Sequence, residues 1–173
     1  CEDDENVYVR VIDYKSGKQA FNLLETYYGI KMQLITYLDA AMKIEEKRHP
    51  GKRIIPAGVY YYNIDDPIIE IAPQEAKKCN SEQDISDKIL EKLKMAGFTN
   101  SNKNIVKMMD STEDKSIVIP VAYNKDGGFK AYSKVYDTEQ INNLVDYMEL
   151  KSVDIGEAIL DGKTDINPYR TGT

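Results

Sequence analysis

Asp13 and Lys15 are the residues whose types and spacing point most directly to chemistry, because they end an apolar run two positions apart. Side chains alternate between the faces of a strand, so a strand here would place Asp13 and Lys15 on one face and Ile12 and Tyr14 on the other. A carboxylate can bind Mg2+, and a neighbouring ammonium can orient a water on that metal and offset charge on a phosphate. The pair therefore has the groups needed to hydrolyse a phosphodiester, although the same spacing also occurs as a solvated strand end.

A second pair of polar residues follows in a segment with helical periodicity. Apolar residues recur at helical spacing over residues 23–42, which predicts a helix. Gln33 and Tyr37 are four positions apart, so they lie on one face of that helix. A strand with Asp-x-Lys followed by a helix with Gln-x-x-x-Tyr is more specific than either element alone. On its own, the helix would be read as a core element with a packed tyrosine and a solvated glutamine.

These two blocks resemble a known family of nucleases. YVRVIDYKSG followed by QLITYLDAA is similar to the RecB-type branch of the PD-(D/E)XK nucleases, and most closely to the C-terminal nuclease domains of the AddB-type subunits of AddAB helicase-nucleases. The resemblance continues through PAGVYYYNIDDPII, ILEKLKMAGF, VKMMDS, IVIPV and EAILDGKTDINPYR, and so covers nearly the whole chain.

The resemblance implies a site and a metal. Asp13 would bind Mg2+, or alternatively Mn2+, and the carbonyl oxygen of Tyr14 would be a further metal ligand. Lys15 would assist catalysis by positioning the attacking water, and Gln33 and Tyr37 would complete the catalytic site.

The chain departs from the family pattern in two respects. The family has another metal-binding aspartate in a strand upstream of the Asp13 block, and we do not assign that role to Asp3 or Asp4, which lie in a polar run. The family's four-iron iron-sulfur cluster is held by cysteines at positions that match neither Cys1 nor Cys79. We therefore expect a fragment of a larger polypeptide, without the cluster ligands and inactive when isolated.

Composition limits the class of protein. The 173 residues are 42% hydrophobic, which is enough for one domain with a core. Two cysteines make neither a disulfide framework nor a zinc pattern. No apolar stretch is long enough to span a bilayer, and the first residues are acidic, unlike the basic and then apolar pattern of a signal peptide. We therefore expect a cytoplasmic protein without a membrane partner.

The charge is an objection to nucleic-acid binding. The net charge is −6, whereas phosphate contacts normally need clustered lysine and arginine. One local basic cluster is present, and it could equally be a solvated helix end; its members are Lys43, Lys47, Arg48, Lys52 and Arg53.

The remaining chain predicts alternating elements. Residues 57–64 read as a strand that pairs beside the Asp13 strand, and residues 81–95 as a helix that Gly97 ends. We expect a short helix over residues 105–109 and an edge strand over 117–122, where Pro120 excludes a central position.

The last third predicts a hairpin and a long helix. Residues 124–128 carry a turn signal before a strand over 130–135. The final helix opens at Asp137 and has one apolar stripe, made by Ile141, Leu144, Val145, Met148, Val153 and Ile159.

Together these patterns predict an α/β fold with a mixed sheet flanked by helices, and the resemblance implies that it is restriction-endonuclease-like and truncated at its N-terminal edge. We expect residues 1–64 to form the catalytic core and 65–173 to be family-specific helices and a hairpin. The function that the resemblance implies is metal-dependent DNA exonuclease activity in an AddAB-type helicase-nuclease that processes double-strand ends for recombinational repair, with DNA and an AddA-type subunit as partners. Helicase activity and ATP use would belong to other parts of that assembly, because the chain has no phosphate-binding loop. A non-catalytic DNA-binding or subunit-interaction module, or a stand-alone nuclease of the same fold, are the alternatives.

Overall fold

The protein is described by a computed structural model that covers residues 1–64 and 82–165. Two compact units divide these residues. The first contains residues 1–9, 22–56 and 138–165, and the second contains residues 10–21, 57–64 and 82–137.

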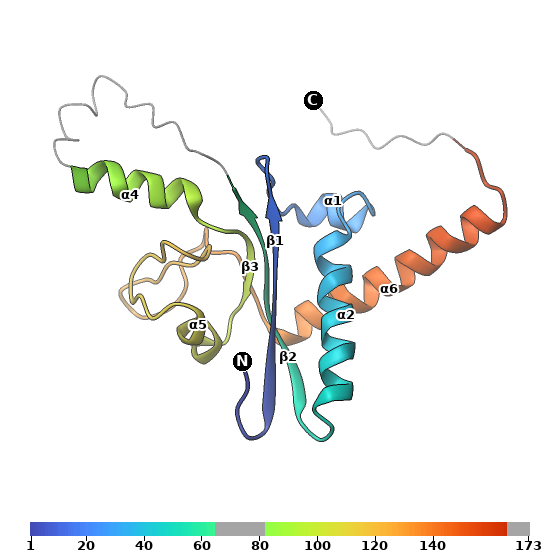
Figure 1. Ribbon diagram of the computed structural model, residues 1–173, viewed down its shortest axis with the longest axis horizontal. Helices are drawn as coiled ribbons and strands as arrows, with labels where there is room; N and C mark the ends of the chain where they lie inside the picture. The colour runs from blue at the N-terminus through green and yellow to red at the C-terminus, as the bar shows by residue number, and fades with distance from the viewer. Residues whose placement is uncertain (65–81, 166–173) are drawn as a thin grey trace. The chain divides into compact units, whose positions relative to one another are not determined.

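Four strands form one sheet in the order β1-β2-β3-β4, and the first three are labelled in Figure 1. Their bounds are β1 Asn6–Lys15, β2 Arg53–Asn63, β3 Ala96–Asn100 and β4 Val135–Tyr136. The order confirms that the strand after residue 56 lies beside the Asp13 strand.

The sheet is mixed, as the sequence predicts. The amide of Arg53 donates to the carbonyl of Glu5 (2.8 Å) and the amide of Ile64 donates to the carbonyl of Lys15 (2.7 Å). Residue numbers increase in the same direction along both strands between these two hydrogen bonds, so β1 and β2 run parallel. Strand β3 is antiparallel to β2 and parallel to β4.

Two helices replace the single helix predicted over residues 23–42. Helix α1 spans Leu23–Tyr27 and helix α2 spans Gln33–Arg48. The side chain of Asn22 caps α1 by accepting hydrogen bonds from the amides of Leu24 and Glu25. The prediction of one continuous helix is wrong because Gly29 adopts φ 79°, a left-handed conformation that turns the chain between α1 and α2.

Helix α6, Thr138–Leu160, packs against α2 within the first unit (Figure 1). The buried residues of α2 are Leu34, Ile35 and Leu38, and those of α6 are Ile141, Val145 and Met148. These apolar faces hold the unit together, since each fully buried aliphatic side chain contributes about 1.5–3 kcal/mol.

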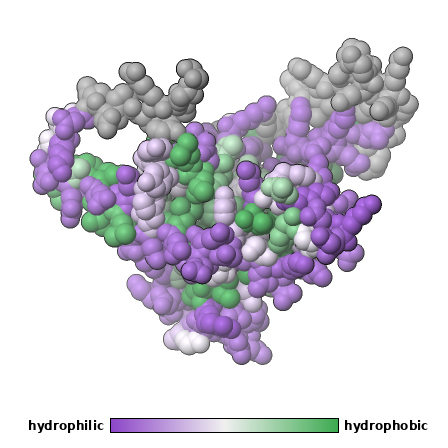
Figure 2. Space-filling model, turned by 180° about the vertical axis from the view of Figure 1, so that it is seen from behind, coloured by the Kyte–Doolittle hydropathy of each residue, from purple (hydrophilic) through white to green (hydrophobic). Residues whose placement is uncertain are grey.

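The apolar stripe predicted for α6 is buried only in its first half. Leu144 is half-buried, but Val153 and Ile159 are exposed. Helical spacing identifies this apolar face without showing what covers it, so it does not predict which half of the stripe is buried. The face of the molecule drawn in Figure 2 is mostly hydrophilic, with smaller apolar areas between the hydrophilic ones.

The second unit is built around the buried middle of β2. Residues 57–61 are buried without alternation, as in a strand covered on both faces. Their core contains Tyr60, whose hydroxyl is 2.7 Å from Oγ1 of Thr99. The core cluster also includes Met95, Val106, Ile119 and Val121, with Ile12 and Tyr62 packed against it.

Helices α4, Glu82–Leu93, and α5, Lys103–Met109, complete the second unit. Helix α5 confirms the short helix predicted near residue 105, and α4 confirms the helix predicted after residue 81. Ser81, where that helix was expected to begin, lies outside the described residues. The prediction that Gly97 ends α4 is wrong, because this glycine belongs to β3, where a Cβ atom would lie 1.9 Å from the carbonyl oxygen of Val59.

The segment after α5 forms less regular structure than the sequence predicts. Residues 117–122 do not form a strand. Within this range, Ala122 makes an isolated antiparallel bridge to Lys115. The turn over residues 124–128 is confirmed by the hydrogen bond from the amide of Asn124 to the carbonyl of Gly128, 2.7 Å. The strand expected over residues 130–135 is reduced to β4. None of the helices in the described residues has the length and apolar character of a membrane-spanning segment.

Candidate active site

Asp13 and Lys15 form an ion pair at the end of β1, with 2.9 Å between Nζ of Lys15 and Oδ2 of Asp13. The Asp13 side chain is 16% exposed and that of Lys15 is 28% exposed, whereas Tyr14 between them is 63% exposed. The alternation along β1 thus brings the carboxylate and the ammonium together on one face, as predicted.

Tyr61 of β2 contributes to the surroundings of Lys15. The ammonium lies 5.7 Å from the centre of the buried Tyr61 ring, within the range of a cation–π interaction. On the opposite face, Tyr14 makes an edge-to-face contact with Tyr62, with 5.6 Å between ring centres. Our sequence analysis missed the role of Tyr61 beside Lys15. Strand alternation could have separated it from Tyr60 and Tyr62, which point to the other face.

Gln33 and Tyr37 form a second pair, in the first turns of α2. Nε2 of Gln33 donates a hydrogen bond to the hydroxyl of Tyr37 over 2.9 Å, and both side chains are exposed. The predicted one-face arrangement of this pair is therefore observed. Asp13 and Lys15 belong to the second unit and Gln33 and Tyr37 to the first, so their joint action in one site stays a prediction.

Asp13 has the properties of a metal ligand. Its Oδ2 atom is buried, and the ammonium of Lys15 lies 2.9 Å from it. In residues 1–64 and 82–165, no group of three histidine, cysteine, aspartate or glutamate side chains could hold a metal ion. One carboxylate still fits Mg2+, because this ion commonly keeps several waters and binds one or two carboxylates together with substrate phosphates.

The cysteines do not fit an iron-sulfur cluster. A four-iron cluster is held by four thiolates, and the chain has two cysteines. Cys1 is exposed and free, and Cys79 lies outside the described residues. The two cysteines of this chain are therefore too few to hold such a cluster.

The basic cluster predicted near the end of α2 is largely neutralised by acids. Lys43 pairs with Asp39 and Glu149 at 3.0 and 3.1 Å. Arg48 pairs with Glu45 at 2.9 Å, and Lys52 pairs with Glu2 at 2.9 Å. Arg53 pairs with Glu5 at 3.1 Å. This favours the solvated-surface interpretation over a DNA-binding patch.

The chain belongs to the PD-(D/E)XK nuclease superfamily, which it matches over residues 2–172. It is 40% identical to the B subunit of the ATP-dependent helicase/deoxyribonuclease of Lachnoclostridium phytofermentans over 98% of the chain and 15% of that relative. The proteins of the same description from Oceanobacillus iheyensis and Clostridium tetani are 38% and 39% identical over 98% of the chain and 14% of their own length. The chain thus spans 15% or less of the length of these relatives.

Proposed function

We propose that the chain is the nuclease part of a helicase–deoxyribonuclease and that it hydrolyses DNA phosphodiesters with a divalent metal, Mg2+ or Mn2+. The observation that carries the proposal is the ion pair between Asp13 and Lys15 on one face of β1, in which the paired carboxylate oxygen is buried. Membership of a nuclease superfamily and the names of the relatives support the same activity.

Asp13 would hold the metal through Oδ2, with the carbonyl oxygen of Tyr14 as a further ligand. When bound, the metal would supply a Lewis acid for the phosphate and lower the pKa of a bound water. Lys15 would then donate hydrogen bonds to the attacking water and to a non-bridging phosphate oxygen, so that its charge offsets the developing negative charge. The ring of Tyr61 would limit the directions that the Lys15 ammonium can take.

Gln33 and Tyr37 would position the DNA strand. Both present polar atoms at an exposed helix end, and their mutual hydrogen bond fixes the orientation of the amide and the hydroxyl. Such positioning residues raise the rate by holding the scissile phosphate in line with the attacking water.

In the whole protein, the substrate would be the DNA ends of a double-strand break, the partner an AddA-type helicase-nuclease subunit, and the location the cytoplasm. The iron-sulfur cluster of the family would be bound by other parts of that protein. The 173 residues alone would bind metal weakly and show no measurable DNA cleavage.

Metal dependence of cleavage tests the proposal. The whole helicase–nuclease containing this chain, with the partner subunit's own nuclease inactivated, is incubated with linear DNA in EDTA, Mg2+ or Mn2+, as wild type and as Asp13→Ala. We expect cleavage in Mg2+ and Mn2+ and none in EDTA or in the variant. Asp154→Ala, at an exposed position of α6, is the matched control. Cleavage that persists in EDTA, or in Asp13→Ala, would contradict the proposal.

A further inference from the structure

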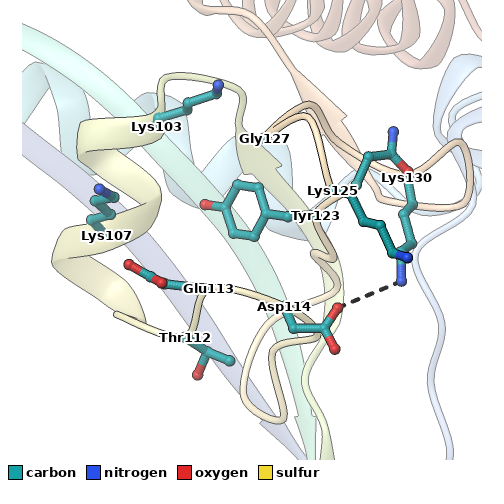
Figure 3. A pocket seen from close by; sticks show the side chains of 10 residues that line it. Lys103, Lys107, Thr112, Glu113, Asp114, Tyr123, Lys125, Gly127 and Lys130 are labelled. Atoms are coloured by element: carbon teal, nitrogen blue, oxygen red, sulfur yellow. Dashed lines mark ion pairs between the residues drawn. The ribbon is translucent and has the colours of Figure 1, made fainter.

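A pocket in the second unit is lined by four lysines. It has a volume of about 750 Å3 and lies between α5 and the loop that contains the turn over residues 124–128. Lys103 and Lys107 line it from α5, and Lys125 and Lys130 line it from the loop (Figure 3). We call this group of four the lysine pocket.

The arrangement of the four lysines follows from local structure. Lys103 and Lys107 are four positions apart on α5, so they project from one side of the helix. Gly127, at φ 78°, allows the tight turn that carries Lys125, and a Cβ atom there would lie 3.7 Å from Nζ of Lys103. The turn therefore brings the loop close to the first lysine of α5.

The pocket is only partly neutralised. Lys130 lies 3.6 Å from Asp114, a long ion pair. Lys103, Lys107 and Lys125 make no ion pair with a described residue, and the other acid that lines the pocket is Glu113. Four lysines thus face two carboxylates in a chain whose net charge is −6. The basic cluster at the end of α2, by contrast, has acidic partners for four of its five members.

Tyr123 adds a hydrogen-bonding group between the two pairs of lysines (Figure 3). Its hydroxyl oxygen is buried and has no hydrogen-bond partner in the described residues. Burial, together with the negative charge of Asp110, raises the pKa of Tyr123, so the hydroxyl keeps its proton and remains a hydrogen-bond donor. A buried donor without a partner is costly in the absence of a ligand.

We propose that the lysine pocket binds the phosphate backbone of single-stranded DNA, at a place separate from Asp13. Clustered ammonium groups recognise phosphates by charge without reading sequence. The volume exceeds that of one phosphate and lies in the range of ligand pockets, so it can accept a nucleotide of a continuous strand. The choice of a single DNA strand rests on the proposed function, because unwinding would deliver one.

Binding of labelled oligo(dT) to the 173-residue chain, measured by fluorescence anisotropy in EDTA, tests this inference. We expect Lys107→Gln to weaken binding about fivefold, the effect of one unit charge in contact with a phosphate in water. The slope of log affinity against log salt should fall in magnitude by about 0.7 for each phosphate that is no longer neutralised. Lys163→Gln, which removes an exposed lysine elsewhere, is the matched control and should change neither quantity.

Glu113→Gln provides a test with the opposite sign, because it removes a carboxylate from the pocket without shortening the side chain. It should tighten oligo(dT) binding at every salt concentration. This gain cannot come from misfolding, which would weaken binding.

Three outcomes would overturn the inference. The first is an equal loss of oligo(dT) affinity in Lys107→Gln and Lys163→Gln. The second is tighter binding of a duplex than of oligo(dT) of the same length, and the third is binding of polyglutamate in place of oligo(dT). Since EDTA suppresses cleavage, the result is independent of nuclease activity. A chain that binds oligo(dT) through these lysines but does not cleave DNA in its whole protein would contradict the proposed function alone.

Discussion

The ammonium of Lys15 lies 2.9 Å from Oδ2 of Asp13, so the lysine supplies the positive charge at the carboxylate oxygen that a metal would bind. The same oxygen is buried. Lysine and metal are therefore expected to compete for one oxygen, and to cooperate only when substrate draws the ammonium towards a phosphate.

This competition predicts opposite effects of Lys15→Met on metal binding and on cleavage. Removal of the ammonium should raise the affinity of the 173-residue chain for Mn2+ about fivefold, because one unit charge no longer opposes the ion. Cleavage by the whole protein should fall about 100-fold or more, because the charge that stabilises the transition state is lost. Electron paramagnetic resonance titration measures the first effect and a single-turnover assay the second. Unchanged Mn2+ affinity would show that metal does not bind at Asp13.

Tyr37→Phe is expected to impair cleavage without affecting stability. The hydrogen bond from Gln33 is exposed, so its loss should change the free energy of unfolding by less than about 0.5 kcal/mol. If the pair positions DNA, cleavage should fall about tenfold or more. Tyr132→Phe, at a tyrosine that is 60% exposed, is the control for loss of a surface hydroxyl. Equal activity of the two variants would remove Gln33 and Tyr37 from the site.

Two glycine substitutions should have opposite effects on stability. Gly97→Ala places a Cβ atom 1.9 Å from the carbonyl oxygen of Val59, and backbone atoms on both strands must move, so we expect a loss of about 3 kcal/mol or more. Gly156→Ala lies in α6 with no atom within 4 Å of the new Cβ, and should stabilise the chain by about 0.5–1 kcal/mol. Urea unfolding of both variants measures the difference. A stable Gly97→Ala variant would contradict the pairing of β2 with β3.

The sequence predicts well those features that depend on local periodicity. Asp13 and Lys15 share a face because strands alternate, and Gln33 bonds to Tyr37 because helical residues four apart are neighbours. The break at Gly29 and the inclusion of Gly97 in β3 were missed, because a glycine signal does not show whether the chain turns or another backbone approaches.

Tertiary placement accounts for the other differences. Ile159, at the end of the α6 stripe, is exposed. Burial of an apolar face depends on which other elements pack against it, and helical periodicity carries no information about those elements. Lys107 and Lys125 line the same pocket because a loop of irregular structure brings them together. Their spacing in the sequence therefore does not predict the lysine pocket. The acids that neutralise the basic cluster, such as Glu149 for Lys43, likewise come from distant positions.

The N-terminal turn should show acid-sensitive stability through Asp3. The hydroxyl of Tyr8 donates to its carboxylate over 2.8 Å, the amides of Glu5 and Asn6 add further bonds, and these bonds lower the pKa of Asp3 from 3.8 to about 2. A lowered pKa in the folded state means that this contribution to stability is complete above about pH 4 and is lost as pH falls through about 2. Carboxyl NMR titration measures the pKa directly. Tyr8→Phe should raise it towards 3.8, and an unchanged value would contradict the assigned cause.

The role of Asp13 as a metal-binding carboxylate is the centre of the account, and Asp13→Asn tests it with the smallest change in shape. Cleavage and ATP-driven unwinding of linear duplex DNA are measured in Mg2+ on the whole helicase–nuclease, with the partner subunit's own nuclease inactivated. We predict that cleavage falls at least about 100-fold while unwinding stays at the wild-type rate, because the substitution removes a negative ligand and no part of a motor. Wild-type cleavage by Asp13→Asn would contradict the account, as would an equal loss of both activities.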